Sequence, residues 1–352
     1  MNRFSHKDIE NSFLHVLKNI NVDEKIAQLT VKGLIHTSLR GVDSHGIRLF
    51  PHYVNSVLKG RLNPTPNFNF QETNISTGKL DADHTFGHAA GIIGMNHTIK
   101  LAQKTGIGMV SVFNSSHCGA LAYYALQACK YDMIGLAFTH ASPKVKTPKS
   151  KRSFFGTNPL CFTAPMKNED PYCFDSAPTL MPFNKIRQYR EDDKELPENI
   201  ATDKNGIETL NPHLATQLLP MADYKGFGLT MLVDVLCGLL TGMPVGNKIS
   251  QMYEEPLSQR RYLGQVFIAI KIDSFEDPDI FKSRLQETCD KIRNEPKINP
   301  DSIIQVAGDP EKRKMKNRLG NGIPIKEFDI NKINKLLLNY DVPSLKPMSY
   351  DS

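Results

Sequence analysis

Short apolar runs alternate with helical patterns through the middle of this chain, and this alternation limits its fold more than any other feature. Gly, Pro and Asn bound the runs, as is typical of strands. The runs are GMVSVF (108–113), IGLAFTHA (134–141), PLCFTAP (159–165) and YCFDSAP (172–178). Apolar residues at helical spacing occupy 88–106 and 119–131, around the first of these runs. Two more strands are predicted at 264–272 and 303–308. The pattern predicts a sheet covered by helices.

Helical patterns occupy both ends of the chain. Ser5 and Asp23 are placed to cap two helices, and a third helix is predicted over 44–60. A helical pattern at 331–342 resembles the patterns at the N-terminal end. A long apolar helix is predicted over 226–246.

The order of these elements predicts an α+β protein. We expect residues 1–73 to pack with 290–352 as a helical domain built from both chain ends. Residues 74–289 are expected to form a helix-covered mixed-sheet domain. The polar, turn-rich segment 185–212 is predicted to be an exposed excursion from that domain.

Composition excludes several classes of protein. The net charge is +6 over 352 residues and both signs are interspersed, so no nucleic-acid partner is expected. Asp234 and several glycines interrupt the most apolar segment, which favours a buried helix over a membrane span. The six cysteines show neither C-x-x-C pairs nor zinc spacing, so we expect no metal. Free cysteines and the lack of a signal-like N-terminus predict a cytoplasmic protein.

Common nucleotide-binding and hydrolase motifs are missing from the sequence. It contains no G-x-x-x-x-G-K-[ST], no G-x-G-x-x-G after a strand, no H-E-x-x-H and no G-x-S-x-G. The absence of these motifs therefore argues against an ordinary Rossmann dehydrogenase and a P-loop enzyme.

The segment GVDSHGIRLFPHYV (41–54) is the first candidate site. In a helix, His45, Arg48 and His52 would share one side, next to an apolar stripe. Histidine titrates near neutrality, and the planar guanidinium group of arginine suits a carboxylate. The alternative is that Arg48 pairs with a local acid such as Asp43 and that the histidines lie on the surface.

Two further candidates follow predicted strands. His117 in NSSHCG (114–119) comes directly after the strand at 108–113, where α/β proteins tend to place chemistry. Asp175 ends an apolar run, so its carboxyl group must be paired, hydrogen-bonded or protonated. The alternatives are a loop histidine bonded to the backbone and a turn-capping aspartate.

Two basic features are candidate anion sites. Lys225 and Gly226 begin the predicted helix at 226–246, where a lysine and free amides suit a phosphate or a carboxylate. Helix capping is the alternative. The run PKVKTPKSKR (143–152) is either a solvated loop or a site for a cofactor phosphate or an acidic substrate.

Four segments, in their order along the chain, resemble the malate/L-lactate dehydrogenase family of the non-Rossmann type. These segments are GVDSHGIRLFPHYV, NSSHCGALAYYA, GTNPLCFTAP and MADYKGFGLTMLVDVLCGLLTG. The family also holds ureidoglycolate, sulfolactate and 2,3-diketo-gulonate oxidoreductases and a cyclic imine reductase. The resemblance covers about residues 5 to 330. It implies NADH or NADPH bound by the sheet domain, a small carboxylate-bearing substrate and a homodimer, with no membrane partner.

The resemblance also assigns roles to residues of this sequence. The implied catalytic residues are His117, His45 and, as in the imine reductase branch, Asp175. The implied substrate contacts are Arg48, Ser44 and Asn158. The implied cofactor contacts are Asp175, Ser176, Ala177, Lys225, Gly226, Gly308 and Asp309. Pro178 stands within a stretch where the family usually reads Asp-Met-Ala-Thr-Ser, and it removes one backbone donor.

The function expected from these residues is hydride transfer between a nicotinamide cofactor and a small 2-oxo or 2-hydroxy acid. Reduction of an imine acid and a non-catalytic binding or assembly role are the alternatives. His117 is predicted to be the acid–base group, with a pKa near neutrality and with Asp175 orienting it or sharing the proton. His45 is expected to open a helix and stay neutral. The lysines of 143–152 favour NADPH over NADH.

Overall fold

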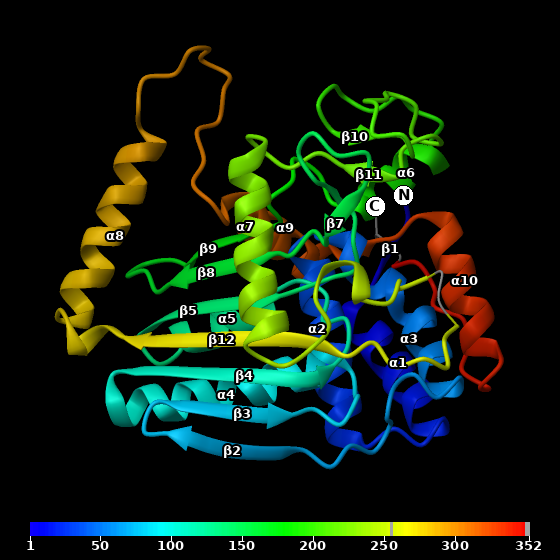
Figure 1. The fold of residues 1–352 in the computed structure, drawn as a ribbon, viewed down its shortest axis with the longest axis horizontal. Coiled ribbons are helices and arrows are strands. Elements are labelled where there is room, and N and C mark those ends of the chain that lie inside the picture. Colours follow the sequence, from blue (N-terminus) through cyan, green and yellow to red (C-terminus); the bar gives the residue numbers. More distant parts are fainter. Residues whose placement is uncertain (254–255, 349–352) are drawn as a thin grey trace.

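A seven-stranded mixed sheet runs through the centre of the molecule, in the order β2–β3–β4–β12–β5–β8–β9 (Figure 1). The structure is a computed structural model that describes residues 1–253 and 256–348. The strands are β2 (Asn69–Asn74), β3 (Thr77–Asp81), β4 (Ile107–Ser115), β12 (Leu263–Lys271), β5 (Met133–Thr139), β8 (Leu160–Ala164) and β9 (Tyr172–Ser176). The pairing of β3 with β4 is parallel and the other pairings in this sheet are antiparallel. Five of the six predicted strands are confirmed.

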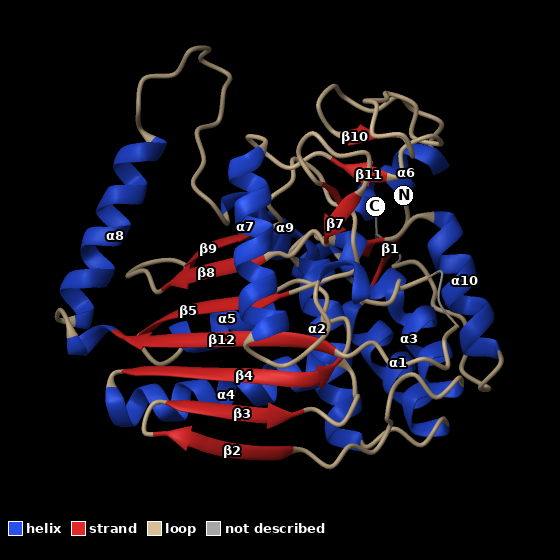
Figure 2. Cartoon of the chain, in the orientation of Figure 1, coloured by secondary structure: helices blue, strands red, loops and turns tan. Residues whose placement is uncertain are grey.

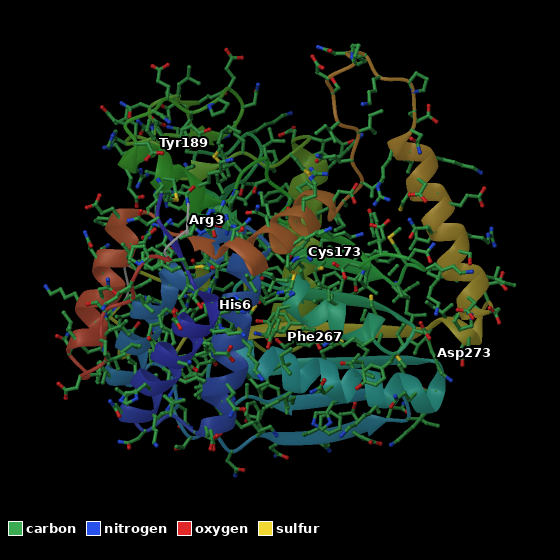
Figure 3. All side chains as sticks on the ribbon, turned by 180° about the vertical axis from the view of Figure 1, so that it is seen from behind. Arg3, His6, Cys173, Tyr189, Phe267 and Asp273 are labelled. Atoms are coloured by element: carbon green, nitrogen blue, oxygen red, sulfur yellow. The ribbon has the colours of Figure 1, made fainter. Side chains whose placement is uncertain are left out.

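Helices cover both faces of this sheet. On one face lie α4 (Gly87–Thr105) and α5 (Ala122–Cys129), which are seen in front of the strands in Figure 3. Phe267 of β12 points to this face and packs edge-on against Tyr124 of α5. On the other face α7 (Tyr224–Asp234) continues into a π-helical turn, Val235–Leu239 (Figure 2). The α+β class is confirmed.

The two ends of the chain share one apolar core. It joins α1 (His6–Asn19), α2 (Glu24–Leu39), α3 (Phe50–Leu58) and α10 (Glu327–Leu338), and β1 (Arg3–Phe4) pairs with β13 (Ile323–Pro324). The predicted caps are present: the Ser5 side chain accepts from Asp8 N, and the Asp23 side chain accepts from Ile26 N. The division into domains at residues 73 and 290 stays a prediction.

The carboxyl ends of three strands meet at the edge of the sheet that faces these helices. Because β12 is antiparallel to both β4 and β5, those two strands run in the same direction. Strand β8 is likewise antiparallel to both β5 and β9. Segments that follow β4, β5 and β9 therefore emerge side by side, between the sheet and the helical ends of the chain (Figure 1).

The predicted helix over 44–60 is wrong in its first part. Residues 43–45 and 47–49 form two separate 3₁₀ turns, and the α-helix begins only at Phe50.

A contact with α2 causes this break. The Ser38 hydroxyl group accepts a hydrogen bond from Ile47 N at 3.0 Å. A Cβ atom on Gly46 would lie 2.0 Å from the same oxygen, so only glycine allows this approach. Since no single helix carries His45 and Arg48, their side chains are not held on one helical face.

The predicted strand at 303–308 is also wrong. This segment is a loop between α8 (Pro278–Arg293) and α9 (Asp309–Asn321). Between the described residues, its one backbone hydrogen bond with the neighbouring β9 is a long one, from Cys173 N to Ala307 O at 3.5 Å. The first isoleucine of the segment, Ile303, is exposed, so this run lacks the burial that a strand pattern implies.

The segment 185–212 is more than an exposed excursion. It contains most of α6 (Phe183–Glu191) and the short β10 (Ala201–Thr202), which joins a small sheet with β11 (Gln217–Leu218), β6 (Val145–Lys146) and β7 (Ser153–Phe155). Buried apolar side chains give this unit its own small core, with Ile186, Leu196 and Leu218 among them. The unit lies above the helical ends of the chain in Figure 1.

Candidate active site

A cleft of ≈ 640 Å³ opens where the carboxyl ends of β4, β5 and β9 face the helical ends of the chain. Seven of the predicted site residues line this cleft: Ser44, His45, His117, Asp175, Ser176, Ala177 and Gly308. These residues come from four separate segments, so the fold alone brings them together.

Two histidines form the centre of the cleft. The rings of His45 and His117 lie nearly parallel, with centroids 5.7 Å apart and an interplanar angle of 21°. The Ser44 hydroxyl group lies 2.8 Å from His45 Nδ1, and the Tyr53 hydroxyl group lies 2.6 Å from His117 Nδ1. Each histidine therefore has one nitrogen fixed by a hydroxyl group. The sequence did not identify Tyr53 as a site residue, because only the folded chain brings it to His117.

Burial governs the acid–base properties of both imidazole groups. It lowers the pKa of His45 to about 4, with a further contribution from the positive charge of Arg48. Burial also holds the pKa of His117 well below its usual range, with smaller contributions from His45 and His88. The near-neutral pKa predicted for His117 is therefore wrong for the free protein, and both rings are neutral at pH 7.

The loop that carries His117 is held close to α4. Gly87 is the first residue of α4, and a Cβ atom there would lie 2.3 Å from Ser116 O. Tyr124 donates a hydrogen bond from its buried hydroxyl group to Cys118 O. Glycine on one side and tyrosine on the other thus fix the backbone around the histidine.

A buried histidine–aspartate pair fixes the loop after β5. His140 Nδ1 lies 3.1 Å from Asp234 Oδ1, and Gly264 N donates to His140 Nε2 at 2.9 Å. Because Nε2 accepts, the proton sits on Nδ1 and points to the carboxylate. This pair explains the aspartate that interrupts the apolar helix. It anchors the backbone next to Ser142, which lines the cleft.

Asp175 lies in the cleft but does not hold His117. Its Oδ2 accepts a hydrogen bond from Ala122 N at 2.7 Å, at the first residue of α5. Burial raises the pKa of Asp175 to about 6, and the backbone donors at the start of α5 and the charge of Arg40 oppose this rise. The prediction that Asp175 orients His117 is therefore not supported by any hydrogen bond between described residues.

Arg48 faces a second cavity of ≈ 510 Å³ that adjoins the first. Its Nη2 lies 3.3 Å from Glu191 Oε1 and 3.4 Å from Asp329 Oδ1. The local acid considered from the sequence, Asp43, pairs instead with Arg318 of α9. The structure therefore places Arg48 in the adjoining cavity and not in the first one, although its charge lies near enough to His45 to lower the pKa of that ring.

The Asn158 side chain binds backbone groups of the protein. Its buried side chain accepts from Ala141 N at 2.9 Å and donates to Thr230 O at 2.8 Å. Both ends of the amide are thereby occupied, and the residue does not line the cleft, so the predicted substrate contact at Asn158 is not found.

Three predicted cofactor contacts also lie off the cleft. Lys225 is exposed at the start of α7, and Gly226 packs against Met221 O. The Asp309 carboxylate binds both Arg293 Nε and Nη2, at 2.9 and 2.7 Å. This ion pair leaves Gly308, and not Asp309, on the cleft surface.

The basic run 143–152 contributes one residue to the cleft, Lys144. Its Nζ lies 4.8 Å from the centroid of the Phe183 ring of α6. Lys149, Lys151 and Arg152 are exposed on the turn between β6 and β7. The run as a whole is therefore a surface turn with one end in the cleft.

Comparison with known proteins decides the family. The model of the malate/L-lactate dehydrogenase family matches residues 4–334. The chain belongs to the malate/L-lactate dehydrogenase family. It is therefore an oxidoreductase that works with a nicotinamide cofactor, and the resemblance seen in the sequence is confirmed.

Individual relatives support this assignment. The chain is 34% identical to a ureidoglycolate dehydrogenase (NAD(+)) from Escherichia coli K12 over 80% of both chains. It is 31% identical to a malate dehydrogenase from Pyrococcus abyssi, over 98% of this chain and 96% of that protein. The crystal structure of malate dehydrogenase from Entamoeba histolytica superposes with a TM-score of 0.92 at 30% identity, covering 97% and 98% of the two chains. In the described part of this chain, no helix has the length and apolar character needed to cross a membrane.

Proposed function

We propose that this cleft transfers hydride between a nicotinamide cofactor and a small 2-oxo or 2-hydroxy acid. The half-buried pair of His45 and His117 carries the proposal, since it places two neutral imidazole groups in a cleft of ≈ 640 Å³. Such a volume suits a small-molecule ligand. The enzymes named malate dehydrogenase among its relatives act on a compound of this class.

The lining of the cleft suits a dinucleotide. Ser176 and Ala177 have short side chains and Gly308 has none, which allows a phosphate to approach the backbone. Gly308 has a φ of 97° at the start of α9, a conformation that favours glycine. Lys144 adds a positive charge on the same surface. When bound, the nicotinamide ring supplies or accepts the hydride, and the protein supplies orientation and proton transfer.

His117 is the proposed proton donor and acceptor for the substrate oxygen. The Tyr53 hydroxyl group can donate to neutral Nδ1 or accept from it when the ring is charged, so it suits both states of the reaction. His45 stays neutral and hydrogen-bonds the same substrate oxygen. The Ser44 hydroxyl group, 2.8 Å from His45 Nδ1, supports this role, because a neutral ring that accepts at Nδ1 carries its proton on Nε2 and can donate it.

Arg48 is the proposed partner of a substrate carboxylate. Its two ion pairs are 3.3 and 3.4 Å long and do not use the two-pronged geometry that arginine offers. A substrate carboxylate that enters from the first cavity competes with Glu191 and Asp329 for this guanidinium group.

Lys144 is the residue of the basic run that can favour NADPH. We expect Lys144→Ala to lower the ratio of kcat/KM for NADPH to that for NADH by about ten- to a hundredfold, as loss of a charged hydrogen bond to the 2′-phosphate would. The triple variant Lys149→Ala, Lys151→Ala and Arg152→Ala is the matched control, and its ratio should equal that of the wild type. A changed ratio in the triple variant alone would contradict this assignment.

The outer face of α7 is the proposed homodimer interface. Large apolar side chains are exposed along α7 and the following turn: Tyr224, Met231, Leu232, Val235, Leu239 and Leu240. Several large apolar side chains exposed on one helix are typical of an interaction site, and members of the family are typically homodimers.

Placing a charge in this patch should produce monomers. Leu239 is 64% exposed, so Leu239→Glu disturbs no core packing but puts a carboxylate into the proposed interface. Sedimentation should give the mass of a dimer for the wild type and of a monomer for the variant. Ile298→Glu changes an equally apolar, fully exposed residue on the loop between α8 and α9, and it should remain dimeric. A monomeric wild type would exclude the interface.

Imine acid reduction is a second candidate, and the raised pKa of Asp175, about 6, favours it because a protonated carboxyl group can donate to a substrate nitrogen. Assaying a panel of 2-oxo acids and cyclic imine acids with NADH and NADPH tests both functions. Oxidation of the cofactor only with imine acids would replace the first proposal with the second.

The proposed location of the protein is the cytoplasm. The six cysteines are free and buried, which supports this location.

A further inference from the structure

Arg187 of α6 lies where the two cavities meet. It lines both of them, together with Ser44, Asn184 and Tyr253. The guanidinium carbon of Arg187 lies 4.0 Å from the centroid of the Tyr253 ring, so the ring supports one flat face of the cation. The edge of the guanidinium group, which carries its donors, is left for other contacts.

Arg187 differs from the neighbouring arginines in its lack of polar partners. Arg48 pairs with Glu191 and Asp329, and Arg190 donates to two backbone carbonyl groups. Within residues 1–253 and 256–348, by contrast, Arg187 forms no ion pair and donates no hydrogen bond. A half-buried arginine of this kind at a cavity junction is suited to an anion that the protein itself does not supply.

The surroundings of Arg187 are positively charged as well. Burial lowers the pKa of His52 to about 4, and the charges of Arg61, Arg261 and Arg187 lower it further. His52 packs against the same Tyr253 ring, with centroids 5.1 Å apart. The cations around His52 therefore disfavour its protonated form. The same excess of positive charge supports an anion-binding role for the junction.

The helix that carries Arg187 is fixed to the catalytic segment. Asn184 Nδ2 donates to Ser44 O at 3.1 Å, and Ser44 directly precedes His45. At the other end of α6, Glu191 pairs with Arg48, and Ile186 is buried in the small core of this unit. The distance between the histidine pair and Arg187 is therefore set by the fold, as a specificity-determining contact requires.

We propose that Arg187 binds a second anionic group of the substrate, a carboxylate or sulfonate at the end remote from the reacting carbon. This inference rests on the proposed function, which places the reacting carbon beside His45 and His117 in the first cavity. The far end of the substrate then points to the junction, where the planar fork of Arg187 meets it. The preferred substrate is accordingly a 2-oxo or 2-hydroxy acid with two acidic groups.

Two four-carbon substrates test this role, because oxaloacetate carries a second carboxylate where 2-oxobutyrate carries a methyl group. The wild-type enzyme should prefer oxaloacetate. Arg187→Gln should lower kcat/KM for oxaloacetate by about ten- to a hundredfold, mainly through KM, and that for 2-oxobutyrate by less than about threefold. Arg187→Lys keeps the charge and loses the fork, so it should restore part of the preference.

Lys185→Gln is the matched control, since it removes one positive charge from an exposed position of the same helix. It should leave both substrates unaffected. An equal loss for both substrates in Arg187→Gln, or a wild type that prefers 2-oxobutyrate, would overturn the role of Arg187 while leaving the proposed function standing. A wild type that reduces no 2-oxo acid would overturn the proposed function and this inference together.

Discussion

Replacing His117 with alanine is expected to lower kcat by about 10²–10⁴-fold, the usual contribution of a general acid–base group. The side chain lines the cleft, and its Nδ1 is held by Tyr53 at 2.6 Å, so Nε2 is the nitrogen left for the substrate oxygen. Alanine removes the proton carrier and leaves the cavity intact. Steady-state turnover with the best 2-oxo acid of the panel measures the loss.

The pH dependence of the reaction should identify the same residue. Burial holds the pKa of His117 well below its usual range. Oxidation of a hydroxy acid needs the neutral ring, so its kcat/KM should be level near pH 7 and fall as the pH drops through the lowered pKa. Reduction needs the charged ring, so its kcat/KM should fall as the pH rises above that value.

Two variants separate the roles of the histidines. His117→Ala should abolish this dependence, whereas His45→Ala should lower the rate and keep it. His15→Ala, on the exposed side of α1, is the control for the loss of a histidine and should behave as the wild type. Loss of the pH dependence in His45→Ala, with its retention in His117→Ala, would exchange the two roles.

Arg48→Lys is expected to lower kcat/KM by about ten- to a hundredfold, although the charge is unchanged. Lysine has no planar fork, and the loss of a charged hydrogen-bonded pair with the substrate carboxylate costs about 1.5–3 kcal/mol. The change should appear mainly as a higher KM, and it should affect substrates with one or two acidic groups alike. That pattern differs from the pattern expected for Arg187.

Arg284→Lys is the matched control for Arg48, because Arg284 also takes part in an ion pair, with Glu276, but is exposed on α8. Its kinetics should equal those of the wild type. If Arg48→Lys also behaved as the wild type, the ion pairs of Arg48 with Glu191 and Asp329 would be its whole role.

Features that depend on neighbours in sequence were predictable. The caps at Ser5 and Asp23 are hydrogen bonds to amides three residues ahead, so the local sequence contains both partners. His117 was found because it directly follows a strand whose apolar pattern is plain. Asp175 was found in the same way, at the end of β9.

Features that depend on distant partners were not predictable. Tyr53 and His117 are 64 residues apart, and Arg48 and Glu191 are 143 residues apart. The break at Gly46 arises from Ser38 on the preceding helix, and no periodic pattern records that contact. Burial, which lowers the pKa of His117, likewise depends on the whole fold.

Asn158 shows a different limit of sequence reasoning. The family resemblance marked its segment, and the flanking residues Thr157 and Pro159 line the cleft. The type of residue did not show whether the amide would face the substrate or the backbone. In the structure its amide oxygen accepts a hydrogen bond from Ala141 N, and its amide nitrogen donates one to Thr230 O. A resemblance therefore locates a site more reliably than it assigns each side chain within it.

Transfer of a labelled hydride tests the central claim most directly. The enzyme would be incubated with a 2-oxo acid and a reduced nicotinamide cofactor deuterated at its hydride-donating carbon, and the product examined by mass spectrometry and NMR. The account predicts a 2-hydroxy acid with one deuterium on the carbon that bore the keto group, and about 10²–10⁴-fold less of this product from His117→Ala at the same enzyme concentration and time. A hydroxy acid without deuterium at that carbon, or as much labelled product from His117→Ala as from the wild type, would contradict it.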